Sequence, residues 1–168
     1  REFEALVDVF GDRLIGYAYR RLGNRHDAED VVQQVFVQAF QVRERYRNVN
    51  KVGPYLFRMT ANACIDWQRH RGRRPEAPLD ENIVELVPAN RPDAGNEAAD
   101  AEEQKRIERL IGELPRRQAE VIRLRVYGDL PFSKIAETLG ISEDTVKSRF
   151  RYALEKLKVK LLGRKEAV

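Results

Sequence analysis

The sequence predicts an all-α protein made of two small helical domains that are joined by an acidic linker. Apolar residues recur at three- and four-residue steps through the chain, and no segment shows the two-residue alternation of a β-strand. Charge divides the 168 residues into three parts: residues 1–75 carry a net charge of +5, residues 76–104 carry −8 and residues 105–168 carry +7. Two basic parts around an acidic one indicate two modules that face a polyanion.

The first domain, residues 1–75, is predicted to begin with two helices. Residues 3–22 have helical periodicity, and Gly23 supplies a stop. Asp27 opens the next helix, where a carboxylate suits the positive end of the helix dipole, and the apolar pattern continues to Phe40.

A third helix completes this domain. Residues 46–53 break the periodic pattern and predict a loop. Pro54 is tolerated in the first turn of a helix, so the helix is expected to begin there and to end in the arginine-rich residues 69–74. These three helices, without a strand, predict an all-α first domain.

Residues 76–101 are predicted to be a linker, because they combine Pro78, Pro88 and Pro92 with many acids and show no sustained periodicity. The second domain is expected to span residues 102–168 and to contain four helices, each marked by its own apolar stripe.

The last two of these helices have the pattern of a helix-turn-helix. Ala136 is a small residue where the helices cross, Gly140 lies in the turn, Ile141 is an apolar plug, and Ser142 is a good N-cap for the final helix. Six residues are expected to form the buried stripe of that helix: Val146, Phe150, Ala153, Leu154, Leu157 and Leu161.

The other side of the final helix is polar and basic. A helix that presents such side chains in its first turns can enter a major groove and reach base edges and phosphates. The alternative is an ordinary solvated helix face. The candidate DNA-binding residues are Thr145, Lys147, Ser148, Arg149, Arg151 and Tyr152.

The first domain carries a different basic surface on and after its third helix, where arginines alternate with aromatic residues. Cations that follow phosphates and aromatic rings that stack on unpaired bases suit a single strand. The alternative places Phe57 and Trp67 in the core and leaves a solvated arginine tail.

Several classes of protein are not expected. No run approaches the ~18 apolar residues of a membrane-spanning helix, and the N-terminal residues lack an apolar signal core. Cys64 is the single cysteine, so no disulfide within the chain is expected. One cysteine and two histidines are too few ligands to predict a metal site. We expect a cytoplasmic protein without a catalytic residue, cofactor or metal.

The chain resembles the group IV, or extracytoplasmic-function (ECF), sigma factors of bacterial RNA polymerase. The segment DAEDVVQQVFVQAF at 27–40 resembles region 2.2, and LFRMTANACIDWQRHRGRR at 56–74 resembles regions 2.3–2.4. Residues 114–157 resemble region 4. The resemblance implies that residues 1–75 are sigma region 2 and residues 102–168 are sigma region 4.

The family implies two roles for region 2. One helix docks on core RNA polymerase, and the residues that match it are Asp30, Gln33, Gln34 and Phe36. A loop captures a flipped base of the −10 promoter element, and the helix that follows it lines the melted DNA strand. The matching residues are Arg47, Asn48, Asn50, Lys51, Tyr55, Arg58, Asn62, Arg69, Arg73 and Arg74. Tyr55 stands where the family usually has tryptophan.

For region 4, the resemblance places the six candidate DNA-binding residues of the final helix against the duplex DNA of the −35 promoter element. The helix over residues 115–127 would approach DNA phosphates or the polymerase flap through Arg116, Arg117, Arg123 and Arg125. The family also implies an anti-sigma protein as a partner.

Two other classes of protein are compatible with parts of the sequence. A helix-turn-helix regulator that acts without polymerase explains the second domain equally well, but it leaves residues 27–74 unexplained. A nucleic-acid enzyme would use Asp27, Glu29, Asp30 or Asp66 as metal ligands, but the sequence has no Ser–His–Asp set, no phosphate-binding glycine loop and no zinc-deaminase motif.

Overall fold

Seven α-helices and one short 3₁₀ helix make up the part of the chain that the computed structural model describes, residues 1–46, 49–72 and 94–166, and no strand occurs in these ranges. The prediction of an all-α fold is confirmed. The elements are α1 (Glu2–Leu22), α2 (Arg25–Gln41), η1 (Arg43–Tyr46), α3 (Val49–Gly72), α4 (Ala94–Gly112), α5 (Arg116–Val126), α6 (Phe132–Leu139) and α7 (Glu143–Glu166).

The junction of α1 and α2 confirms the predicted stop at Gly23, but α2 begins at Arg25, two residues before the predicted start at Asp27. Gly23 adopts the left-handed conformation, with φ 77°, and its N–H donates to the carbonyl oxygen of Tyr19 at 2.7 Å. Asn24 is the N-cap of α2, and its Oδ1 accepts a hydrogen bond from the Asp27 N–H at 3.0 Å. The two helices therefore turn back on one another over a very short connection.

The start of α3 differs from the prediction. The expected loop over residues 46–53 is wrong for its second half, because α3 begins at Val49 and contains Pro54 in its interior. Gly53 is buried, and a Cβ added there would lie 3.1 Å from Cε1 of Phe10 in α1. Close packing of α1 on this turn outweighs the low helix propensity of glycine and proline.

The start of α4 also differs. The predicted linker over residues 76–101 is wrong for residues 94–101, which form the first turns of α4, while residues 76–93 lie outside the described part. Alanine and glutamate are strong helix formers, and they are frequent here once Pro92 has passed. Local propensity extends the helix beyond the apolar stripe that predicted it.

The helix-turn-helix has the predicted geometry. Gly140 ends α6 in the left-handed region with φ 67°, and Ser142 Oγ accepts a hydrogen bond from the Thr145 N–H at 3.1 Å. Val146 is completely buried on the inner side of α7. These contacts fix the direction in which α7 leaves the turn.

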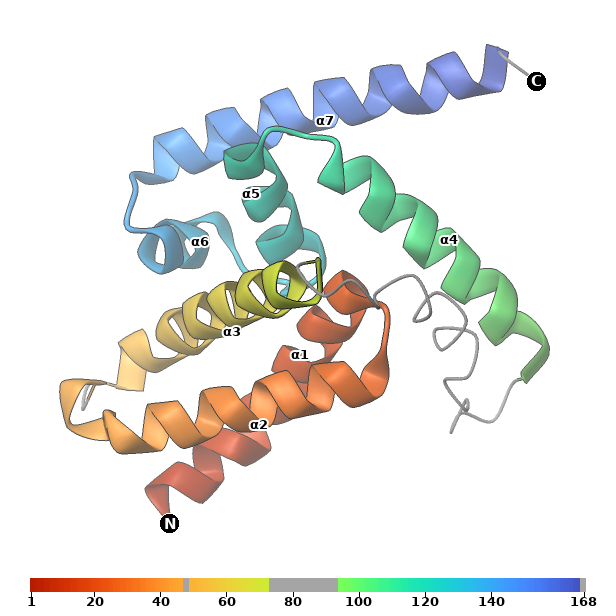
Figure 1. The fold of residues 1–168 in the computed structure, drawn as a ribbon. Helices are drawn as coiled ribbons and strands as arrows, with labels where there is room; N and C mark the ends of the chain where they lie inside the picture. Colours follow the sequence, from red (N-terminus) through yellow and green to blue (C-terminus); the bar gives the residue numbers. More distant parts are fainter. Residues whose placement is uncertain (47–48, 73–93, 167–168) are drawn as a thin grey trace.

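The predicted buried stripe of α7 is only partly right. Val146 and Ala153 are fully buried and Phe150 packs against the core, but Leu154 and Leu161 are 46% and 43% exposed. Figure 1 shows that α7 runs well past α5 and α6, so these two helices do not cover its second half.

Loss of the Ser142 cap should measurably lower stability. We expect Ser142→Ala to reduce the free energy of unfolding by about 1 kcal/mol, because the Thr145 N–H loses its side-chain acceptor. Urea denaturation followed by circular dichroism measures this. Ser133→Ala, an exposed serine of α6, is the control. Equal losses for the two variants would contradict the capping role.

The first helix group, α1 to α3, packs against the second helix group, α4 to α7. The ring of Tyr17 in α1 lies 6.0 Å from that of Phe57 in α3 and 6.4 Å from that of Tyr127, which follows α5. Tyr17 and Phe57 are fully buried, and Tyr127 is nearly so. One continuous core therefore joins residues from α1 and α3 to residues from α5.

Candidate nucleic-acid interface

The outer side of α7 presents the six residues predicted to bind DNA. Lys147, Ser148, Arg151 and Tyr152 are exposed, and Thr145 and Arg149 are half-buried. The guanidinium of Arg151 lies 5.2 Å from the centre of the Tyr152 ring, which holds the two side chains together at the surface. The buried stripe on the inner side makes this polar face point outward.

The helix-turn-helix is braced by aromatic contacts behind α7. The rings of Phe132 in α6 and Phe150 in α7 meet edge to face at 5.1 Å. The Arg125 guanidinium lies 4.8 Å from the Phe132 ring and donates to the carbonyl oxygen of Leu130 at 3.0 Å. Arg125 thus supports the α5–α6 connection in addition to any role in binding phosphate.

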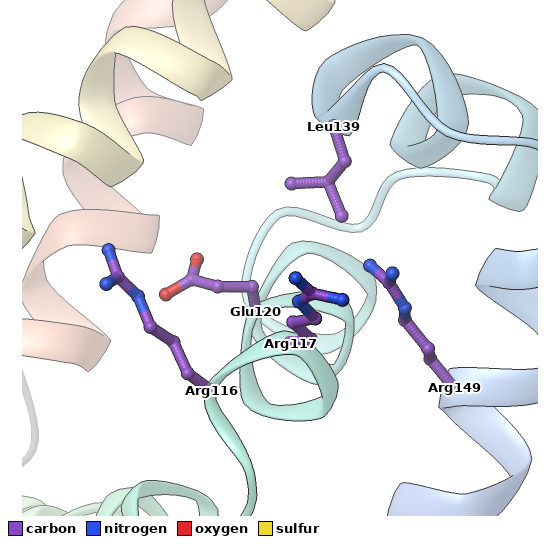
Figure 2. A pocket seen from close by; sticks show the side chains of 5 residues that line it. All are labelled: Arg116, Arg117, Glu120, Leu139 and Arg149. Carbon is purple, nitrogen blue, oxygen red and sulfur yellow. The ribbon is translucent and has the colours of Figure 1, made fainter.

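Beside the first turns of α7 lies an open pocket with a concentration of positive charge. Its lining comes from three helices and consists of Arg116, Arg117, Glu120, Leu139 and Arg149 (Figure 2). The carboxylate of Glu120 forms hydrogen bonds with Arg21 and Arg123, so the net charge around the pocket is positive. Guanidinium groups with this arrangement can bind anionic phosphate oxygens.

Arg123 does not belong to this surface, although the resemblance implies that it approaches DNA phosphates or the polymerase flap. It is buried, with only 7% of its surface exposed. Its Nε donates to Glu108 Oε1 at 3.0 Å, and its Nη1 donates to Glu120 Oε1 at 3.4 Å. The expectation for Arg123 is wrong, because its position on α5 faces α4 and the core.

A second polar surface lies on α3. Tyr55, Arg58, Asn62 and Arg69 share one side of the helix, within about 60° of one another at about 100° per residue. Arg58, Asn62 and Arg69 are exposed, and Tyr55 is half-buried. A tyrosine and two arginines aligned with an amide have the groups needed to contact unpaired bases and phosphates.

The other aromatic residues of α3 do not join that surface. Phe57 is fully buried, as the core alternative proposed. Trp67 is half-buried and is covered by Arg71, whose guanidinium lies 4.7 Å from the ring centre. Arg71 Nη1 also donates to Asp27 Oδ2 at 3.1 Å, which ties the end of α3 to α2.

Some predicted −10 residues cannot be placed. Arg47, Asn48, Arg73 and Arg74 lie outside the described residues. The backbone of Asn50 and Lys51 belongs to the first turn of α3, and their side chains are not described.

A third polar surface lies along α2. Asp30, Gln33 and Gln34 are exposed, whereas Phe36 is buried and its ring meets that of Phe3 edge to face at 6.1 Å. An open groove runs along this side of α2, and its lining is Asp30, Gln33, Gln34, Val37, Gln38 and Gln41.

Sequence reasoning missed three residues of the α2 groove: Val37, Gln38 and Gln41. They follow Gln33 and Gln34 at helical spacing, and this was the signal that could have found them. Val37 is 58% exposed, which leaves an apolar contact point among the amides.

No group of three or more metal-ligating side chains occurs among the described residues. Within the same ranges, no helix has the length and apolar character needed to cross a bilayer.

Comparison with known proteins adds to these observations. Two family models match: "Sigma-70 region 2" over residues 6–74 and "Sigma-70, region 4" over residues 110–159. The chain is similar to the ECF RNA polymerase sigma factor SigW of Bacillus subtilis, with 29% identity over 167 residues, 95% of this chain and 88% of that protein.

It is also similar to the ECF RNA polymerase sigma factor SigL of Mycobacterium tuberculosis H37Rv, with 32% identity over 159 residues, 94% of this chain and 87% of that protein. Among solved structures, it resembles CnrH in complex with the cytosolic domain of CnrY. The TM-score is 0.66 and the identity is 27%, over 96% of this chain and 88% of that one.

Proposed function

This chain belongs to the extracytoplasmic-function (ECF) group of the sigma-70 family, and from that premise we propose how its surfaces select a promoter for bacterial core RNA polymerase. A sigma factor is a transcription initiation factor. It shifts promoter DNA toward the open state by binding that state more tightly, so we propose that this chain acts without a catalytic site of its own.

The proposed division of labour follows the two helix groups. Residues 1–75 form region 2, and residues 102–168, preceded by the first turns of α4, form region 4. The family matches over 6–74 and 110–159 lie within these bounds and support the division. Because α4 begins at Ala94, we place the end of the linker there.

Region 4 is proposed to read the −35 duplex with the outer side of α7. The observation that carries this proposal is the capped helix with its exposed polar residues, next to the Arg116, Arg117 and Arg149 pocket. Side chains in the first turns of α7 would reach base edges in the major groove, while the pocket would hold backbone phosphates.

Region 2 is proposed to bind the melted −10 strand along α3. Tyr55 offers a ring for stacking, Arg58 and Arg69 offer charge to the phosphates, and Asn62 offers donor and acceptor atoms to a base edge. The segment from Arg47 to Lys51, which runs into the first turn of α3, is the proposed site for a flipped base.

Core polymerase is proposed to dock on the α2 groove. Asp30, Gln33 and Gln34 would form hydrogen bonds there, and Val37 would add an apolar contact. Phe36 would support this surface from the core, since its ring packs on Phe3.

We further infer an anti-sigma protein as a regulatory partner and the bacterial cytoplasm as the location. The similar protein CnrH was solved together with the cytosolic domain of CnrY, which supports a protein partner for this chain. Polymerase and promoter DNA, the other proposed partners, are cytoplasmic in bacteria.

The decisive experiment is transcription in vitro from a promoter library with core polymerase, with and without this protein. We expect selected transcripts to appear only with the protein. Arg151→Ala should reduce them by roughly 5- to 150-fold, because loss of a DNA contact costs about 1–3 kcal/mol. Lys158→Ala, an exposed position in the second half of α7, is the control.

A helix-turn-helix regulator that acts without polymerase would give a different result in this experiment. A protein that shifts duplex DNA alone but adds no transcript to core polymerase would overturn the proposed function. Transcripts that are unaffected by Arg151→Ala would move the −35 contact away from α7.

A further inference from the structure

The outermost side of α7 carries Ser148, Arg151 and Tyr152. At about 100° per residue, these three side chains lie within about 60° of the direction opposite the completely buried Val146. They are three and four residues apart, so they are neighbours on one surface, and all three are exposed. When the first turns of a recognition helix enter the major groove, the side chains on its outermost side reach deepest toward the base edges.

The charges on α7 distinguish this outermost side from its two flanks. Asp144 and Glu155 are exposed within about 20° of its centre, and carboxylates in that position are repelled by phosphates. Lys147 and Arg149 lie about 80° and about 120° from the centre, on opposite flanks, and Arg149 also lines the pocket beside α7. Cations on the flanks suit the phosphate backbones that border the groove. The base edges are therefore left to the three residues of the outermost side.

Two of these three residues contact each other. The Arg151 guanidinium lies 5.2 Å from the centre of the Tyr152 ring, within the range of a cation–π attraction. Tyr152 is 48% exposed, so its ring contacts the arginine and still faces outward. An arginine has many rotamers, and part of its binding free energy is spent on fixing one of them. Tyr152 restricts the guanidinium before DNA arrives.

A guanidinium held in this way is suited to guanine. A ring contacts the face of the planar guanidinium group and leaves its N–H edge free to donate hydrogen bonds. Guanine presents the acceptors O6 and N7 in the major groove, and one arginine binds both at once. Arg151 can therefore keep its contact with Tyr152 while it reads guanine. The hydroxyl of Ser148 can bond to any of the bases and adds less discrimination.

The Tyr152 ring would then lie against a neighbouring base pair. Adjacent base pairs are about 3.4 Å apart along the DNA, so two groups 5.2 Å apart reach the same base pair or adjoining ones. Among the four bases, thymine carries a methyl group in the major groove, and apolar groups recognise it by direct contact. An exposed tyrosine ring suits that methyl group.

We propose that Arg151 and Tyr152 act as one reading unit, in which Tyr152 positions Arg151 to bind a guanine of the −35 element and itself contacts a thymine at an adjoining base pair. The inference rests on the proposed function of region 4. It goes beyond that function by naming the two bases and by making Tyr152 a positioning residue for Arg151.

The experiment selects promoter DNA with the full chain. A library of promoter duplexes with a randomised −35 region is bound by the chain together with core polymerase and by the chain alone, and the recovered DNA is sequenced. For the wild type, we expect guanine to be enriched at one position, with thymine at an adjoining base pair. Lys158→Ala, an exposed position in the second half of α7, is the control and should select the same sequences.

Arg151→Lys tests the guanine contact, because it keeps the charge but removes the planar donor fork. We expect the preference for guanine over the other bases to fall by roughly 5- to 150-fold, the worth of one bidentate contact. Salt dependence of binding should change little, since the charge remains. Circular dichroism checks that this variant and those of Tyr152 remain helical.

Tyr152→Leu tests the positioning role, because leucine is apolar but has no ring. The preference for guanine should fall by roughly 2- to 5-fold, although Tyr152 does not touch that base. Tyr152→Phe keeps the ring and should retain the guanine preference. In an Arg151→Ala background, Tyr152→Leu should no longer change the preference at the guanine position, because the two residues act together.

The outcomes separate the reading unit from the proposed function. A guanine preference that survives Arg151→Lys would overturn the role of Arg151, and one that survives Tyr152→Leu would overturn the positioning role of Tyr152. Either result leaves the proposed function standing if transcripts appear. Selection of the expected bases without any transcript from core polymerase would support the reading unit and overturn the proposed function. If neither the chain nor its complex with polymerase selects any sequence, both are wrong.

Discussion

Arg123→Ala should lower the free energy of unfolding by about 3–5 kcal/mol, the largest loss expected for a change to one charged residue of region 4. The side chain is 9% exposed and links Glu108 of α4 to Glu120 of α5. Its removal leaves the Glu108 carboxylate, 18% exposed, with the Tyr127 hydroxyl as its remaining hydrogen-bond partner among the described residues. A loss of about 3 kcal/mol corresponds to a fall in Tm on the order of 10 °C.

The measurement is thermal and urea unfolding followed by circular dichroism. Arg117→Ala is the matched control: it is an exposed arginine of the same helix and should unfold like the wild type while weakening the binding of −35 duplex DNA. If Arg123→Ala were as stable as the wild type and weakened only DNA binding, Arg123 would serve DNA and the structural role assigned here would be wrong.

The chain should lose several kcal/mol of stability as the pH rises from about 9 to about 11, because three buried groups hold their protons in the folded state. Burial raises the pKa of the Cys64 thiol to about 12. Burial also raises the pKa of Tyr17, and burial together with the neighbouring Glu108 charge raises that of Tyr127.

The sign follows from proton binding. In the unfolded chain, cysteine ionises near pH 8.5 and tyrosine near pH 10, so above about those values the unfolded state releases protons that the folded state keeps. The stabilising contribution is complete at lower pH and falls by about 1.4 kcal/mol per pH unit for each group until the folded pKa is reached.

Urea denaturation at a series of pH values measures this loss. Tyr127→Phe should make the dependence on pH shallower, because it removes one of the three groups. Tyr152→Phe, which changes a tyrosine 48% exposed on α7, should leave it unchanged. A midpoint that does not move between about pH 9 and about pH 11 would contradict the assignment of buried, protonated groups.

Local patterns in the sequence were sufficient to predict the helices, apart from the starts of α3 and α4. Three- and four-residue periodicity predicted the all-α fold, and Gly23, Gly140 and Ser142 marked helix ends that the structure confirms. These are local signals: a left-handed glycine or an N-cap is decided by a few neighbouring residues. The polar side of α7 followed in the same way, because a buried stripe on one side of a helix leaves the other side exposed.

Contacts between residues far apart in the sequence could not be predicted from local patterns. Nothing near Gly53 indicates that Phe10 packs on it, so the start of α3 was predicted too late. Nothing near Arg123 or Arg21 separates a buried arginine from a DNA-binding one, because the deciding partners are 15 residues away in Glu108 and 99 residues away in Glu120. Periodicity shows which side of a helix is apolar, and a buried charge depends on which carboxylate the fold brings to it.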